Sequence, residues 1–503
     1  MLPRGWLSTV KPHTRNIPKY RNTSCPTLTS HEIMRGASTM ATPNRIHIAP
    51  ENTGLLKISQ NADAAKTVTE LLQKDLEEHH VFFNKEGFHN HIVHHLLSLY
   101  GTSAGPSSLQ KAWDGNASYQ RPVQPTHASA TPTQLADWAT AKQHLGKEQY
   151  YPDFLAFFQR EIEKSSVADV LNRYVFAEGD ERADDMLIRL FGGFVHPLIQ
   201  LMYGIEWDQP VIVAEALAQA CVHKDDLCTF MLGAERLSRE RQQQQQQQQA
   251  DHEMGSILSL YEAIPRDEKI SSAAREEDAN KMRDGVLTRA GDEMAALAAR
   301  VHVRPEELHE RTVEMFNAAM YVAAGAAVAR PGKHAKFDFF LIHHVNVAPI
   351  LLSINAASWI PTAAKVRLLE WKIRIDLVQY AARAVPSLSL ERIAAYRPKP
   401  KDDKFTNAAA SGDSSNIVDL VSRLHDLDDD GHAIKLVRAA AVCQQVSRPL
   451  EDKLGDRLPL RGKEIWNKVH HLIADAAEGP GPRWVRTTGM ESAWKDVPDA
   501  PKL

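Results

Sequence analysis

Residues 362–385, with the sequence TAAKVRLLEWKIRIDLVQYAARAV, decide the fold class. Apolar side chains recur here three and four positions apart, so that Val366, Leu369, Ile373 and Tyr380 fall along one face of a helix. The stretch has no glycine, and its only flanking prolines stand just outside it, where they do not interrupt a helix. The pattern therefore predicts a long helix with one buried face.

The same periodicity recurs along most of the chain. It begins near Ser165 and again near Pro305, which is followed by two glutamates in the first turn, where acidic side chains favour a helix start. Alternation of β-branched and polar residues, the mark of a strand, is nearly confined to residues 45–48. We therefore expect an all-α fold, built as a single large helical domain.

Composition predicts three parts along the chain. In the first part, residues 1–39, the segment before Glu32 carries five basic side chains and no acidic one, a bias typical of a mitochondrial transit peptide or of a disordered extension. We favour the extension, with Met40 as an alternative start. Residues 40–480 form the expected helical domain, with a surface insertion at about 236–284 that includes the glutamine run 242–249. Residues 481–503 are expected to form an extended tail.

Charge and cysteine content exclude several protein classes. The 59 basic and 63 acidic side chains leave a net charge of -4, which repels phosphate backbones and argues against a nucleic-acid partner. Four scattered cysteines are too few for a disulfide scaffold, so a reducing compartment fits best. We expect a cytoplasmic protein, with mitochondrial targeting left open by the basic leader.

Residues 339–360 carry no formal charge and are long enough to suggest a membrane span. They also contain His343, His344, Asn346 and a central Pro349, and so many polar groups are costly in lipid. A helix buried inside the protein and lining a polar site explains the same composition. We therefore expect no membrane span.

Histidines are frequent, 23 in all, and several lie within apolar stretches. His91 and His95 are four residues apart in such a stretch, and an i, i+4 pair of imidazoles can chelate zinc, copper or iron. The spacing alone is equally compatible with a solvated or hydrogen-bonded face.

Two further histidines stand at positions where a helix is interrupted or begins. His196 lies in a run without charge between Arg189 and Glu206, and Pro197 predicts a kink beside it. His432 opens a helix, whose dipole disfavours imidazolium and keeps a neutral ring that can bind a metal. A core histidine bonded to a carbonyl, or an incidental one beside capping aspartates, remains the alternative at each position.

Spacing assigns no role to Lys372, whose amine becomes reactive only where burial lowers its pKa. A rival metal motif is the His-x-Asp pair of His223 and Asp225, which facial-triad iron oxygenases use. We disfavour it because its surroundings are predicted to be helical and charged. Glycine-rich dinucleotide turns, a P-loop and a Gly-x-Ser-x-Gly elbow are all missing from the sequence, which argues against a flavin enzyme.

Four blocks, taken in order, resemble the questin oxidase-like family of fungal proteins. They are HNHIVHHLL at 89–97 with YQRP at 119–122, GFVHPLI at 193–199 with YGIE at 203–206, HHVNVAP at 343–349, and DGHAIK at 430–435. The resemblance extends from about residue 46 to about residue 446. The family includes enzymes that open anthraquinone rings by Baeyer-Villiger-type oxygenation in polyketide pathways, some described as NADPH-dependent and others as using non-haem iron.

The resemblance implies a helical oxidoreductase, a monooxygenase or dioxygenase that acts on an aromatic polyketide with O2. For iron-using relatives it implies Fe(II) bound by four histidines and a carboxylated lysine, with NADPH left open as a further cofactor. His344 is preferred over His343 because it directly precedes the Val-x-x-Ala-Pro-like stretch. The implied ligands are His91, His196, His344, His432 and Lys372, with His95 and His343 as second choices.

Two alternatives remain open. One is a metal-free oxygenase that uses NADPH at a site without the usual dinucleotide turn. The other is a non-catalytic helical scaffold or polyketide-binding protein, in which the histidines serve only as hydrogen-bonding groups in the core. Metal analysis of the purified protein separates these alternatives.

Deletion of residues 242–249 should leave stability and activity almost unchanged. The glutamine run is of low complexity, and shortening a surface segment alters chain entropy only logarithmically, by less than about 1 kcal/mol. Thermal melting and turnover of the deletion variant check this. A large loss of stability would show that the run is packed against the domain.

Overall fold

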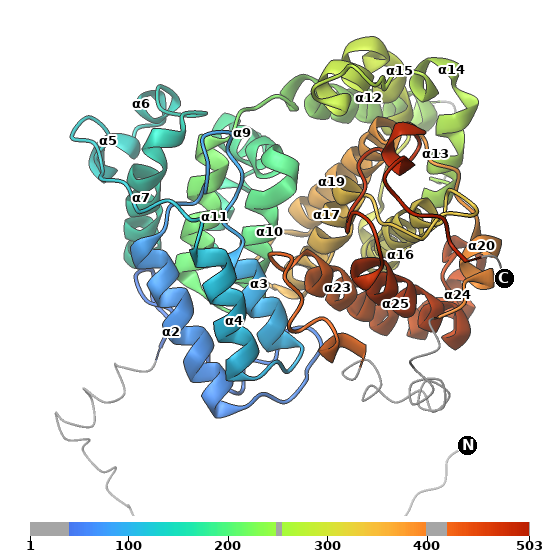
Figure 1. The fold of residues 1–503 in the computed structure, drawn as a ribbon. Coiled ribbons are helices and arrows are strands. Elements are labelled where there is room, and N and C mark those ends of the chain that lie inside the picture. The colour runs from blue at the N-terminus through green and yellow to red at the C-terminus, as the bar shows by residue number, and fades with distance from the viewer. Residues whose placement is uncertain (1–39, 248–253, 399–419, 502–503) are drawn as a thin grey trace, which may run out of the picture. The chain divides into compact units, whose positions relative to one another are not determined.

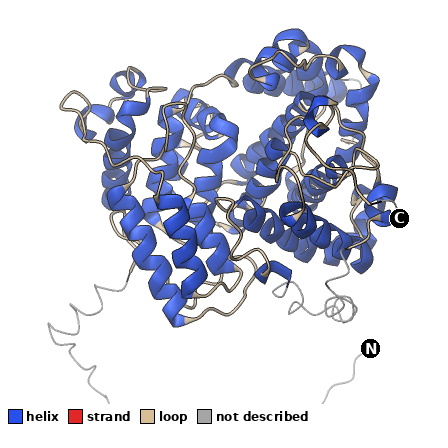
Figure 2. Cartoon of the chain, viewed as in Figure 1, coloured by secondary structure: helices blue, strands red, loops and turns tan. Residues whose placement is uncertain are grey.

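The computed structural model describes residues 40–247, 254–398 and 420–501. The chain divides into one unit, Met1–Met40, of which only Met40 is described, and a second unit, Ala41–Leu503, to which everything below belongs. Across the described residues the backbone forms helices and isolated β-bridges but no sheet (Figure 2). The all-α fold predicted from sequence is confirmed, whereas the predicted leader lies outside the described residues.

Three helices near the start of the described chain lie side by side: α2 (Ala62–Glu78), α3 (Ile92–Gly101) and α4 (Pro106–Ala117) (Figure 1). Asn61 caps α2, because its side chain accepts hydrogen bonds from the first backbone amides of the helix. Every residue of α3 is buried, so this helix is a core element. Its N-terminus is consequently held inside the protein.

Helix α11 (Pro210–Val222) lies at the centre of this part of the molecule. It packs against α7 (Tyr151–Lys164), α9 (Glu181–Leu190) and α10 (Gly192–Glu206). Its residues from Val211 to the end of the helix are all buried, as expected for a helix that is apolar on every side. Helix α10 also contacts α3 and the later helices, and so connects the two parts of the core.

The second part of the core is built around α17 (Phe339–Val347), which contacts α10, α16, α19 and α23. These and their neighbours are α16 (Leu308–Ala327), α18 (Ile350–Ala356), α19 (Thr362–Ala382), α23 (His432–Ser447) and α25 (Gly462–Glu478). Helix α19 confirms the predicted long helix, but its residues 368–382 are buried on all faces and not on one face only. Its charged side chains must therefore find partners inside the protein.

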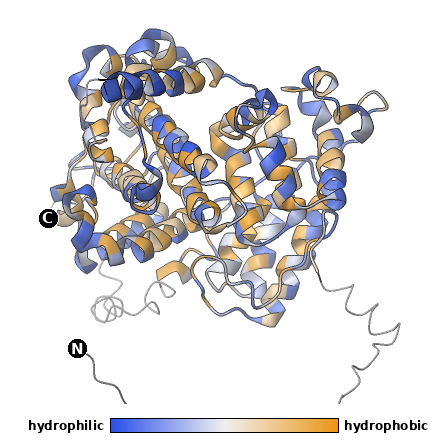
Figure 3. Cartoon of the chain, turned by 180° about the vertical axis from the view of Figure 1, so that it is seen from behind, coloured by the Kyte–Doolittle hydropathy of each residue, from blue (hydrophilic) through white to orange (hydrophobic). Residues whose placement is uncertain are grey.

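The remaining segments are short or lie at the edge. The helices are α5 (Pro132–Leu135), α6 (Trp138–Lys142), α8 (Val167–Tyr174), α12 (Cys228–Gln247), α13 (Ile257–Ala263), α14 (Glu268–Ser271), η3 (Lys281–Leu287), α15 (Gly291–Ala298), α20 (Leu390–Ala395) and α24 (Glu451–Leu454). The single turns are η1 (Glu148–Tyr150), η2 (Ile264–Arg266), η4 (Pro305–Glu307), η6 (Arg448–Leu450), η7 (Gly455–Arg457) and η8 (Ser492–Trp494). Helix α12 contains glutamines 242–247 and is largely hydrophilic in Figure 3. Ile257, Leu260 and Ile270, which follow it, join the main core.

The apolar stretch Phe339–Ala356 is long and apolar enough to cross a membrane, as is the bent pair α9 and α10. Two thirds of the first stretch, 67%, is buried inside the protein, as in a core helix. Asp338 caps its start, and Phe339 N–H donates to Val485 O at 2.8 Å. This hydrogen bond ties the C-terminal segment, including Trp484, to the start of α17.

Candidate metal centre

Four histidines from four helices turn their rings toward one another. His91 immediately precedes α3, His196 lies in α10, His343 in α17, and His432 begins α23. All four are buried. The Nε2 atoms of His91 and His196 are 2.9 Å apart, those of His432 and His343 are 3.4 Å apart, and the ring centroids of His196 and His343 are 4.9 Å apart. We call these four residues the histidine cluster.

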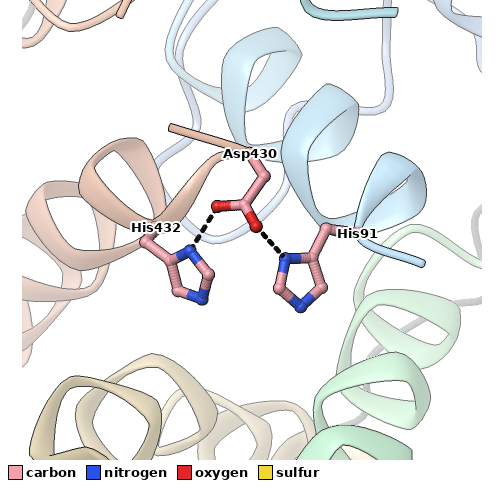
Figure 4. Close-up of side chains that lie close together, drawn as sticks. All are labelled: His91, Asp430 and His432. Carbon is pink, nitrogen blue, oxygen red and sulfur yellow. Dashed lines mark hydrogen bonds and ion pairs between the residues drawn. The ribbon is translucent and has the colours of Figure 1, made fainter. Parts of the chain in front are cut away.

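One carboxylate orients two of the four rings. Asp430 accepts a hydrogen bond from His91 Nδ1 at 3.0 Å through one oxygen and from His432 Nδ1 at 2.5 Å through the other (Figure 4). Burial by itself would raise the pKa of Asp430, but the two imidazoles, His432 foremost, hold that pKa well below its ordinary value. Asp430 is therefore ionised, and both rings carry their proton on Nδ1.

Backbone carbonyls orient the other two rings. His196 Nδ1 donates to Gly193 O and His343 Nδ1 donates to Phe339 O, each at 2.6 Å. A carbonyl only accepts, so these partners also assign the proton to Nδ1. In the neutral form of each ring the Nε2 atom carries a lone pair, and the four Nε2 atoms face one another.

Three rings of the cluster, those of His91, His196 and His343, are held neutral. Burial, followed by the charge of Lys435, lowers the pKa of His91 to about 4. Burial is also the main cause that holds the pKa values of His196 and His343 well below normal, because charging a ring inside the protein is costly. Neutral imidazoles are the form that binds metal ions.

The donor set fits a transition-metal ion. Two lone pairs at 2.9 Å repel unless a cation lies near both, and buried acceptors without donors cost free energy. Imidazole nitrogens suit iron, zinc and copper, and metal-bound histidines typically donate their other N–H to a carboxylate or carbonyl. Both features are present in the cluster. The ligand atoms of His91, Asp430 and His432 also lie within 4.8 Å of one another.

Local backbone geometry makes room for the rings. Gly431, at φ +88°, precedes His432, and a Cβ there would approach the ring of His95 to 2.6 Å. Before His196, Gly193, Phe194 and Val195 are all left-handed, with φ of +51°, +54° and +62°. A Cβ on Gly193 would collide with His223. At the two non-glycine residues this conformation costs roughly 1–3 kcal/mol each, and such strain is typical of functional sites.

Lys435 lies about one helical turn after His432 and is also buried. Burial lowers its pKa to about 8, although Asp430 and Asp429 act in the opposite direction. Its charge in turn lowers the pKa values of His91 and His343. In the part of the chain that the structure describes, Lys435 Nζ makes no hydrogen bond or ion pair. Sequence reasoning missed both this lysine and the bridging role of Asp430.

The structure does not bring His344 or Lys372 to the cluster. His344 Nδ1 donates to Asp376 at 2.6 Å, and Lys372 Nζ pairs with the other oxygen of the same carboxylate, 3.8 Å from Met315 Sδ. Successive residues of a helix point roughly 100° apart, so α17 directs His343 to the cluster and His344 to α19. His343, the second choice from sequence, thus occupies the position in the cluster that was expected for His344.

The other histidines considered from sequence lie near the cluster with different partners. His95 Nδ1 accepts a hydrogen bond from Asn116 at 3.0 Å, which places its proton on Nε2 and leaves no lone pair there. His223 Nε2 lies 2.7 Å from His89 Nε2, whereas Asp225 is exposed and 3.6 Å from Arg189. His223 and Asp225 therefore face different partners, His89 and Arg189, and do not converge on one site.

A cavity of about 1170 Å³ opens onto the cluster. His91, His196 and His432 line it. Nine of its other lining residues are Phe, Tyr or Trp, which offer flat, apolar contacts, and they stand among charged residues such as Lys85, Asp226 and Arg486. The aromatic lining residues include Phe83, Phe88, Tyr119, Phe194, Phe340 and Trp484.

Comparison with known proteins places the chain among fungal oxidases. The family model described as questin oxidase-like matches residues 88–440. A questin oxidase of Aspergillus fumigatus is 35% identical over 467 residues, covering 91% of this chain and 100% of that protein. The Baeyer-Villiger oxidase ptaJ of Pestalotiopsis fici is 33% identical, with coverages of 91% and 99%. The Baeyer-Villiger monooxygenase dmxR6 of a Cryptosporiopsis species is 33% identical, with coverages of 90% and 98%.

Replacement of Lys372 by Met should reduce stability without touching the histidine cluster. The change leaves Asp376 buried with His344 alone, and breaking a buried ion pair in this way costs about 3–5 kcal/mol. Denaturant unfolding measures the loss. The control is Lys66→Met, at an exposed i, i+4 pair, which should change stability by less than about 0.5 kcal/mol. Equal unfolding free energies in the two variants would contradict the assignment of Lys372 to a structural pair.

Proposed function

The chain belongs to the questin oxidase-like family and is an oxidoreductase of the Baeyer-Villiger type, and we propose that it cleaves a ring of an aromatic polyketide at a metal ion held by the histidine cluster. The observation that carries the metal proposal is the set of four facing Nε2 lone pairs. Each ring directs its Nδ1 proton to a carboxylate or carbonyl, so in the neutral form of the rings no proton lies between the Nε2 atoms. A cation resolves the repulsion.

Under this proposal His91, His196, His343 and His432 bind the ion through Nε2, and iron is the metal we favour. Iron, when bound, supplies the redox chemistry that brings dioxygen to react with an electron-rich phenol or hydroquinone. Asp430 keeps two of the rings in the tautomer that binds, and burial of the rings keeps bulk water away. The fourth ligand in this proposal is His343 and not His344, because His343 faces His432 whereas His344 faces Asp376.

We assign the carboxylated lysine of this proposal to Lys435 instead of Lys372. A neutral lysine amine adds to carbon dioxide, forms an N–C bond and releases a proton, and the product is an anionic carbamate. This reaction needs a buried amine that is not already committed to an ion pair, and Lys372 is paired with Asp376. Lys435 is buried beside the cluster and has a lowered pKa. Its carbamate would contribute one oxygen ligand.

The cavity supports the substrate part of the proposal. Its aromatic walls and its volume of about 1170 Å³ are sufficient for a polycyclic aromatic molecule, with room to spare for a second small molecule such as O2. Turnover measured before and after chelation of the metal distinguishes the proposed enzyme from a metal-free, NADPH-linked oxygenase and from a non-catalytic binding protein, which has no turnover to lose. The proposed enzyme loses turnover when its metal is removed, whereas an NADPH-linked enzyme without metal does not.

Metal retention in single variants tests the ligand assignment. The protein purified with iron should contain about one iron ion per chain. His196→Ala and His343→Ala should each lose most of that iron, because each removes one of the facing Nε2 atoms. His344→Ala, a matched change on the same helix, should keep iron in the folded protein, since His344 faces Asp376. Loss of iron in His344→Ala with retention in His343→Ala would reverse the assignment.

Arginine substitutions at the two lysines test the carbamate. Arginine keeps the charge but cannot form a carbamate. Lys435→Arg should therefore weaken iron binding at least about ten-fold, whereas Lys372→Arg should leave it within about two-fold. The zinc-loaded protein, supplied with carbon-13 bicarbonate, should show a carbamate carbon resonance that is present in Lys372→Arg and absent from Lys435→Arg. The reverse pattern would return the lysine role to Lys372.

A further inference from the structure

Phe194 is a large apolar side chain that is exposed to solvent. It is 38% exposed, lines the cavity, and lies two residues before His196. Its backbone is left-handed, as are those of Gly193 and Val195 beside it. A bulky residue rarely adopts this conformation, and the left-handed turn presents the ring to the cavity instead of to the core. Neither burial nor helix propensity explains this placement.

A buried cation supports the Phe194 ring from behind. The rings of Phe194 and Phe340 have centroids 4.7 Å apart and planes tilted by 45°. The guanidinium of Arg383 lies 4.2 Å from the Phe340 ring centroid. Arg383 is only 3% exposed and does not line the cavity, so it approaches Phe340 from the interior. Arg383, Phe340 and Phe194 form a chain of contacts that runs from the core to the cavity.

In the described part of the chain Arg383 makes no ion pair within 4.0 Å, although the buried carboxylate of Asp338 acts on its charge. Its Nε and Nη1 are buried and have no hydrogen-bond partner in the described part of the chain. Contact with the face of an aromatic ring is favourable for a guanidinium and offsets part of that cost. A cation behind a pair of contacting aromatic rings also favours an electron-rich ring system at the open end of the pair, since the cation draws π-electron density inward.

We infer that Phe194 is the stacking platform for the flat ring system of the substrate, held in place by Phe340 and Arg383 beside the histidine cluster. This inference rests on the proposed function, because it names how that site selects its substrate. The platform favours planar, electron-rich rings over saturated rings of the same skeleton. Its place two residues before His196 sets the stacked ring next to the cluster.

Other exposed aromatic residues in the cavity lack such support. Phe88 is 53% exposed and Tyr119 is 41% exposed, and both pack on Phe83. In the described chain, no cation–ring contact is found at any of these three residues. We therefore assign them to the walls of the cavity and not to the platform.

Calorimetric titration of the metal-loaded protein with 1-naphthol and with decahydro-1-naphthol tests the platform. The two probes share a skeleton, but only the first is planar and aromatic. Phe194→Leu should weaken binding of 1-naphthol about ten-fold and leave that of decahydro-1-naphthol within about two-fold. Phe194→Tyr, which keeps the ring face, should bind both like the wild type. Thermal melting of each variant verifies folding.

Trp359→Leu is the matched control, because Trp359 is 36% exposed and does not line the cavity. It should bind both probes like the wild type. Unchanged 1-naphthol binding in Phe194→Leu, or a ten-fold loss in Phe88→Leu instead, would overturn the platform and leave the proposed function standing. Failure of the wild type to bind 1-naphthol would likewise overturn the platform, whereas the proposed function is tested separately by iron retention and by loss of turnover on chelation.

Discussion

The carboxylate of Asp430 is the contact on which the rest of the site depends. It accepts from His91 at the start of α3 and from His432 at the start of α23, two helices far apart in the sequence. By fixing the proton of each ring on Nδ1, it turns both Nε2 lone pairs toward the interior of the cluster. Without this carboxylate the two rings would be free to adopt the other tautomer, in which Nε2 is a donor.

Backbone carbonyls fix the Nδ1 proton of the other two rings, as Asp430 does for His91 and His432. Gly193 O and Phe339 O accept from His196 and His343, and both carbonyls are held by special local geometry. Gly193 belongs to a left-handed turn, and Phe339 stands at the capped start of α17. The strain at the turn serves two ends, because the same residues orient His196 and present Phe194 to the cavity.

Much of this architecture is readable from sequence. The 3.6-residue periodicity predicts the helices because each must bury an apolar face, and α19 formed at the expected place. His91, His196 and His432 were predicted as site residues from motif resemblance, and the structure brings these three together. Helical phase separates His343 from His344, but motif position does not reveal which of two adjacent rings faces inward. The role of Lys435 and the pairing of Lys372 depend on the packing of α23 and α19 against other helices, which no local pattern specifies.

The position at which a metal ion binds tests the ligand assignment most directly. A crystal of the iron-loaded protein, measured at the iron absorption edge, locates that ion directly through its anomalous scattering. The account predicts one strong peak among the Nε2 atoms of His91, His196, His343 and His432, at roughly 2.0–2.2 Å from each, with Asp430 still bound to the Nδ1 atoms. A peak beside His344, or iron bound by the Asp430 carboxylate with the four Nε2 atoms unoccupied, would contradict it.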